Sequence, residues 1–272
     1  VDPFALFDKY GADATRWYLL YVSPAWSPTK FDEEGLIEIQ SKFFGTLKNV
    51  YNFFVLYANQ DEIDPRNFQV DPAAQPELDR WILSKYHQLI ADVTEEMNVY
   101  DHMKAVRKIQ HFVTEDLSNW YIRRARRRFW EEELTEDKKS VYRVTYDILV
   151  GVAQLSAPFA PFLSDEIYKK LTGEESVHLS FFPKADLSRV DKAVEARMDL
   201  VRDLVGLGRG AREKERIKVR QPLSRILVDG KYESQISDLT DLIMEELNVK
   251  EVVFEHQLEG YKIGRASCRE GV

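Results

Sequence analysis

The stretch from Asp101 to Glu133 reads DHMKAVRKIQHFVTEDLSNWYIRRARRRFWEEE. At the 100° per residue of an α-helix, one face collects the apolar residues Ala105, Val106, Ile109, Phe112, Val113, Leu117 and Trp120. Such a stripe is typical of a helix that packs one side against a core. The stretch is therefore predicted to be the helix around which the rest of the chain is organised.

The same face changes character toward its C-terminal end. Arg123, Arg124 and Arg127 fall in the angular sector that apolar side chains occupy earlier in the stretch. Burying an unpaired guanidinium is costly. We therefore expect the helix to leave its bundle near Trp120 and to lay a basic face along a surface or groove. The arginines are flanked by aromatic residues at Trp120, Tyr121, Phe129 and Trp130.

Two interpretations of this basic run compete, and a protein-binding patch is a third. Arginine binds phosphate through a planar fork and aromatic rings stack on exposed bases, which favours a nucleic-acid site. The alternative is a structural helix whose arginines pair with Glu131 to Glu133 and other acidic surface. The leading candidates for RNA contact are Asn119, Trp120, Arg123, Arg124, Arg127 and Arg128. Trp120 taken alone is also a plausible core residue.

Composition limits the class of protein. At 272 residues the chain is long enough for two domains, or for one large core with appendages. Its 44% hydrophobic and 31% charged content is typical of a soluble globular protein. The formal net charge of −8 argues against a protein that coats nucleic acid nonspecifically. An acidic protein with one basic patch is better suited to binding one specific RNA. No DNA partner is expected.

Targeting and metal signals are missing from the sequence. No run of eighteen apolar residues is present, so no membrane partner is expected. The first ten residues show no signal peptide and lack an initiating Met, which indicates a segment of a longer chain. Cys268 is the single cysteine, and the five histidines are scattered, so we expect neither a disulfide nor a metal site. A cytosolic setting fits.

The first part of the chain is predicted to be an antiparallel helical bundle with short loops. Two short helices within residues 1–31 come first, and the bundle spans 32–183. Its helices are expected near 32–60, 77–98, 101–133, 137–157 and 161–171. Pro158 breaks the fourth of these helices, and Gly173 caps the last. Residues 176–183 are expected to be an extended strap.

The composition changes after the bundle. Residues 184–263 are predicted to contain a long helix at 190–215, then a strand at 225–229, a helix at 234–247 and a strand at 249–255. This is a small α/β module, and the fold class is mostly α. The tail 264–272 resembles a cloning remnant and is set aside. A GxGxxA spacing at Gly206, Gly208 and Ala211 lies in a helical pattern, so it does not predict a dinucleotide site.

A second group of basic residues lies in this module. Arg212, Lys214, Arg216, Lys218 and Arg220 alternate with other residue types. In an extended stretch they would face one side and contact phosphate, whereas the alternative is a solvated surface. In the first part of the chain, Arg16 is flanked by Trp17 and Tyr18, and functional and structural roles are equally open for it.

The run DLSNWYIRRARRRFW at 116–130 resembles the signature of the anticodon-binding domain of isoleucyl-tRNA synthetases. The resemblance extends over about residues 1–263, with the motifs in the family's order. It includes VDPFALFDKYGADATRWYLLYVSPAWSP, KFFGTLKNVYNFFVLYA, APFAPFLSDEIYKKL, VHLSFFP, KVRQPLSRI and LIMEELNVKEV. Valyl and leucyl relatives share the bundle, and valyl-tRNA synthetase ranks second because the WYIRR run favours the isoleucyl family.

The resemblance implies a class Ia anticodon-binding bundle in a chain that begins just after the family's KMSKS loop. The parent would be a class I ligase that activates isoleucine with ATP and esterifies it to its tRNA. Neither a HIGH-like tetrapeptide nor a Rossmann sheet is readable, so this segment is expected to be non-catalytic and without a cofactor. Its expected partners are isoleucine tRNA and the catalytic domain of the same chain. Arg16 and the 212–220 residues would touch the stem or elbow of the tRNA.

Two other classes of function remain open from sequence. One is a bundle that docks another protein through its acidic faces. The other is a self-sufficient enzyme with an unrecognised site.

Overall fold

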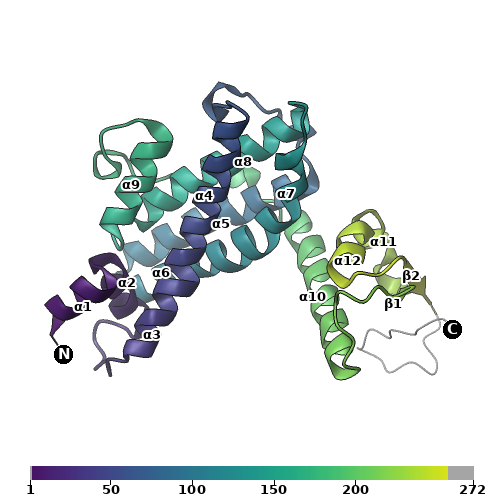
Figure 1. Cartoon of the computed structure of the whole chain (residues 1–272), viewed down its shortest axis with the longest axis horizontal. Coiled ribbons are helices and arrows are strands. Elements are labelled where there is room, and N and C mark those ends of the chain that lie inside the picture. The colour runs from purple at the N-terminus through teal and green to yellow at the C-terminus, as the bar shows by residue number, and fades with distance from the viewer. Residues whose placement is uncertain (1, 257–272) are drawn as a thin grey trace. The chain divides into compact units, whose positions relative to one another are not determined.

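Helices account for most of the chain, as predicted. The computed structural model describes residues 2–256, which divide into two compact units, one ending at Asp191 and one beginning at Lys192 (Figure 1). The first unit consists of helices α1 (Pro3–Tyr10), α2 (Ala12–Val22), α3 (Glu33–Glu38), α4 (Gly45–Gln60), α5 (Glu77–Asn98), α6 (His102–His111), α7 (Arg123–Trp130), α8 (Glu136–Ser156) and α9 (Pro161–Thr172). These helices form the expected bundle.

Two of these helix pairs are continuous through π-helical segments. Ile39–Phe44 joins α3 to α4, and Phe112–Ile122 joins α6 to α7. We call residues 102–130 the central helix. In a π-helix each amide bonds five residues back rather than four, so each turn contains more residues.

The apolar stripe of the central helix is buried, as predicted, from Ala105 to Trp120. The expected departure from the bundle near Trp120 is wrong, because Ile122, Ala125 and Phe129 are buried as well. The wider turns of the π-helical segment explain the error. Stepping at 100° per residue drifts across this segment, so the assigned faces beyond it are rotated from the true ones.

A buried carboxylate joins three parts of the bundle. Asp79 on α5 is fully buried. It accepts hydrogen bonds from the Tyr121 hydroxyl at 2.9 Å, the two terminal Arg128 nitrogens at 2.6 and 2.8 Å, and the Ser140 hydroxyl at 2.6 Å. Burial, and then the Asp79 charge, raises the pKa of Tyr121 well above its usual value, so the phenol remains a donor. The central helix and α8 are thus fixed to α5.

The sharp bend between α8 and α9 is satisfied by side chains. Pro161 begins α9, where its missing N–H is not needed. Asp13 on α2 accepts from the amides of Phe162 and Leu163 at 3.3 and 2.7 Å, replacing partners that a helix N-terminus lacks. Gly173 ends α9 in the left-handed conformation, as predicted. The following strap contains one 3-10 turn, Val177–Leu179, and is otherwise irregular.

The second unit has the predicted order of helix, strand, helix and strand. It contains α10 (Lys192–Lys214), β1 (Ile226–Asp229), α11 (Glu233–Ile236), α12 (Thr240–Leu247) and β2 (Val252–Glu255). The strands are parallel, with Ile226 beside Val252. Gly208 on α10 allows close packing, since a Cβ there would lie 2.3 Å from the Leu247 side chain. The tail and residues 257–263 of the predicted module lie outside the described residues.

We expect Asp79→Ala to destabilise the chain by about 3–5 kcal/mol, because it removes the buried carboxylate that pairs with the two terminal nitrogens of Arg128. Urea unfolding followed by circular dichroism measures the change. The control is Glu166→Ala, which breaks an exposed helical pair with Lys170 and should cost at most about 0.5 kcal/mol. Equal unfolding midpoints for the two variants would contradict the role assigned to Asp79.

Candidate nucleic-acid interface

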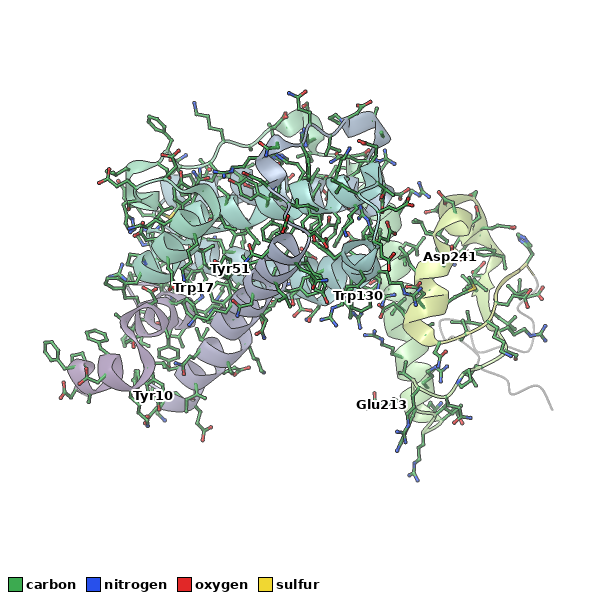
Figure 2. All side chains as sticks on the ribbon, turned by 45° about the horizontal axis from the view of Figure 1, so that its top comes forward. Tyr10, Trp17, Tyr51, Trp130, Glu213 and Asp241 are labelled. Atoms are coloured by element: carbon green, nitrogen blue, oxygen red, sulfur yellow. The ribbon has the colours of Figure 1, made fainter. Side chains whose placement is uncertain are left out.

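The C-terminal end of the central helix presents a basic and aromatic surface. Arg126 and Arg127 are exposed, and so is Trp130, at 54%. Figure 2 labels Trp130 on the first unit. We call these three residues the terminal patch. Arg126 and Trp130 are four residues apart and therefore lie on one side of the helix. Exposed cations beside an exposed indole can contact phosphate and stack on a base.

Phe53 on α4 packs between the terminal patch and the core. The Arg126 guanidinium lies 5.8 Å from the centroid of the Phe53 ring. That ring packs edge-on against the buried Phe129 at 5.1 Å. Among residues 2–256, Arg126 forms no ion pair, so its charge faces solvent rather than a carboxylate. Sequence reasoning did not select Arg126, and it noted Trp130 only as a flanking aromatic. Their four-residue spacing was the available signal.

Three other predicted residues lie on the same helix. Asn119 is exposed, while Arg123 and Arg124 are half-buried. The Arg123 Nε donates to the Asn119 carbonyl at 3.0 Å. The structure therefore brings Asn119, Arg123 and Arg127 to one continuous helix, as the sequence predicted.

Two predicted contacts on the central helix are corrected. Trp120 is 5% exposed and packs in the core, so its ring cannot stack on a base. Arg128 donates to the Asp79 carboxylate, and its Nε donates to Asp137 at 2.7 Å. Its guanidinium is occupied by protein carboxylates and does not reach phosphate.

Arg16 also bonds to the protein itself. Its Nε and Nη2 donate to the carbonyls of Phe159 and Pro158, each at 3.2 Å. These bonds tie α2 to the turn before α9. The structural interpretation that the sequence left open is the one that this geometry favours.

The basic residues of the second unit do not form the expected extended stretch. Helix α10 continues to Lys214, and Arg216 takes a left-handed turn with φ of 57°. Arg212 is 1% exposed, and it donates to the carbonyls of Lys218, Leu247 and Asn248 at 3.1, 2.6 and 3.2 Å. Its role is structural, which corrects the predicted phosphate contact. The remaining residues, Lys214, Arg216, Lys218 and Arg220, are exposed.

A pocket of about 370 Å³ opens beside the central helix. Its lining includes Tyr21, Lys42, Thr46, Arg107, Gln110 and Asn119. We call it the interhelical pocket, because its residues come from α2, from the segment 39–60 and from the central helix. Sequence reasoning identified only Asn119 among these, since the others share no motif.

Two other kinds of site are absent from the part of the chain that the structure describes. Within residues 2–256, no group of three or more His, Cys, Asp or Glu side chains could bind a metal ion. None of the helices in this range combines the length and apolar character needed to span a membrane. Cys268 lies outside the described residues.

Known proteins resemble this chain in sequence over most of its length. Residues 79–227 match the family described as the anticodon-binding domain of tRNA ligase. The isoleucine–tRNA ligase of Porphyromonas gingivalis is 43% identical over 269 residues, which are 97% of this chain and 24% of the relative. The isoleucine–tRNA ligase of Clostridium novyi is 45% identical over 267 residues, which are 96% of this chain and 25% of the relative. The chain thus spans about a quarter of the length of the curated relatives it matches.

A solved structure shares the fold. It is the ternary complex of Agrobacterium radiobacter K84 agnB2 LeuRS with tRNA and LeuAMS. The match has a TM-score of 0.53 and 20% sequence identity. It covers 70% of this chain and 22% of the chain in the solved structure. The likeness confirms the predicted, mostly helical fold.

We expect Arg212→Ala to destabilise the chain by about 1–3 kcal/mol, because three carbonyls lose a buried donor. The matched control is Arg220→Ala, at an exposed position eight residues along, which should change stability by at most about 0.5 kcal/mol. Urea unfolding of both variants measures the difference. Equal stabilities, together with a weakened affinity for tRNA in Arg212→Ala alone, would restore the original prediction.

Proposed function

The chain belongs to the family of anticodon-binding domains of tRNA ligases, and from this premise we propose that it binds the anticodon arm of an isoleucine-accepting tRNA. The observation that carries the proposal is the terminal patch, whose exposed arginines and indole lie at the end of a helix whose apolar face is buried. The isoleucine assignment is supported by relatives named isoleucine–tRNA ligase at 43–45% identity.

The terminal patch and the residues beside it divide the binding between them. Arg126 and Arg127 neutralise phosphates and set the register of the RNA. Trp130 stacks on a base that has left its own stack, a contact worth about 1–3 kcal/mol. Asn119 offers amide hydrogen bonds to a base edge. Because the whole chain carries a net charge of −8, the surroundings of this patch disfavour nonspecific coating of RNA.

The parent protein is proposed to activate isoleucine with ATP and to esterify it to the same tRNA, in a cytoplasmic setting. Support comes from the names of the relatives, which are about four times as long as this chain. The chemistry is assigned to the catalytic part of the parent chain, a further partner of this segment. Isoleucine-dependent ATP–pyrophosphate exchange by the 272-residue chain alone would contradict this placement.

Removing the two exposed arginines tests phosphate contact. Arg126→Ala combined with Arg127→Ala should weaken binding of isoleucine tRNA by about tenfold and should lower the slope of log affinity against log salt by about 1–2. Filter-binding titrations at several salt concentrations measure both quantities. The control removes two exposed lysines of α9, Lys169 and Lys170, which pair with Asp165 and Glu166. An equal loss in the control would show that only net charge matters.

The exposed indole tests base stacking. Trp130→Ala should weaken tRNA binding by about 1–3 kcal/mol, and Trp130→Phe should recover part of the loss because a phenyl ring also stacks. Trp26 is a matched control, since its side chain is 74% exposed, and Trp26→Ala should leave binding unchanged. The titration is repeated with valine tRNA as competitor. Equal competition by valine and isoleucine tRNAs would remove the isoleucine assignment.

A further inference from the structure

The strap, residues 176–183, is fixed to the bundle by side chains of α8 and α9. Asp165 on α9 accepts a hydrogen bond from the Val177 amide at 2.9 Å, and the Val177 side chain is buried. Gln154 on α8 donates through its Nε2 to the Phe181 carbonyl at 3.2 Å. The 3-10 turn of the strap packs against α9 (Figure 1). The backbone of the strap is therefore held in one conformation.

Two large apolar side chains of the strap face solvent. Leu179 is 70% exposed and Phe181 is 90% exposed. Single apolar side chains scattered over a surface are ordinary, but these two line the same pocket. Because the backbone that carries them is fixed, a partner that covers them meets side chains already in place. Little conformational entropy is then lost on binding at this end of the contact.

The pocket beside these side chains has a volume of about 470 Å³, and we call it the strap pocket. This lies within the roughly 300–1,000 Å³ of pockets that bind small organic groups. Within residues 2–256, its two carboxylates form no ion pair, and both residues are exposed. The rim of the pocket is thus apolar and negative. The lining includes Gln154, Tyr168, Glu174, Glu175, Leu179 and Phe181.

The cations nearest in sequence do not neutralise this rim. The lining contains no lysine, arginine or histidine. Lys169 and Lys170 pair with carboxylates of their own helix at 3.8 and 2.6 Å. The His178 Nε2 donates to the Pro161 carbonyl at 3.2 Å, and the exposed Lys184 is outside the lining. A cation supplied by another molecule would therefore complement the charge of the pocket.

We propose that the strap pocket docks a segment of a partner protein in which a basic side chain lies next to an apolar one. The apolar side chain covers Leu179 and Phe181, and the cation meets Glu174 and Glu175. Lysine and arginine suit this site because their methylene stems lie on apolar surface while the charge reaches a carboxylate. A cation is also attracted to the face of a phenyl ring. The two carboxylates repel the phosphates of RNA and of anionic lipids, so neither is the occupant.

A synthetic peptide tests the strap pocket on the 272-residue chain. The probe is a short, capped, fluorescently labelled peptide in which arginine and leucine alternate. Its counterpart has glutamate in place of each arginine. We expect the arginine peptide to bind at least about tenfold more tightly, because like charges placed together at an interface are costly. Fluorescence anisotropy measures both affinities, and equal affinities would overturn the proposal.

Reversing the charge of the rim tests where the arginine peptide binds. Glu174→Lys combined with Glu175→Lys should shift the preference toward the glutamate peptide. The matched control is Glu132→Lys combined with Glu133→Lys, which reverses two adjacent exposed glutamates in the loop after α7. The control should keep the preference of the unmodified chain. If both pairs of substitutions change the preference equally, the peptide responds to net charge alone and the strap pocket is not its site.

Removing the apolar side chains tests the other half of the contact. Leu179→Ser combined with Phe181→Ser should weaken binding of the arginine peptide by about tenfold, because apolar area is no longer buried. Both side chains are exposed, so these changes leave the fold intact. Unchanged affinity would contradict the proposal.

Two further measurements separate this proposal from other occupants. Sedimentation velocity should show a monomer, and self-association abolished by the Leu179 and Phe181 variant would make a second copy of the chain the occupant. The same variant should bind isoleucine tRNA normally, and a clear loss would place the strap on the RNA surface. Either result would overturn the proposal. Normal tRNA binding by the Arg126 and Arg127 variant would instead remove the proposed function and leave the strap pocket standing.

Discussion

The bond between the Asp79 carboxylate and Arg128 is the interaction on which the bundle's geometry depends. A charge taken out of water is stable only with close, well-directed partners. Asp79 has four donor contacts, which come from the central helix and from α8. Those donors fix the rotation of the central helix about its own axis. The outward direction of Arg126 and Arg127 follows from that rotation, so the surface that contacts solvent is set by a contact in the core.

One run of five arginines from Arg123 to Arg128 therefore has two roles. Arg128 closes the core, whereas Arg126 lies over Phe53 and faces solvent. The difference arises because adjacent residues of a helix point in directions about 100° apart. A binding surface beside a structural ion pair gains rigidity from it, since the helix that carries the exposed side chains cannot rotate freely.

Much of the fold could be predicted from sequence because its signals are local. Pro158 marks the α8–α9 bend, Gly173 marks the end of α9, and apolar periodicity locates the long helices. The candidate site was harder to predict, for two physical reasons. The π-helical segment shifts the helix phase, which periodicity cannot detect, so the helix was expected to leave its bundle near Trp120. Arg212 is buried and donates to carbonyls about 35 residues away in sequence, such as that of Leu247. No local sequence pattern contains that information.

The length of the π-helical segment has a consequence for how this sequence can vary. Deleting one residue between Phe112 and Ile122 would change the phase of the helix beyond it and carry Arg128 away from Asp79, because the number of residues per turn in this segment sets the direction of the arginines. The loop between α4 and α5 has no such coupling and can lengthen at small cost. Insertions and deletions among descendants of this chain should therefore accumulate in that loop, while the residue count of the central helix stays constant.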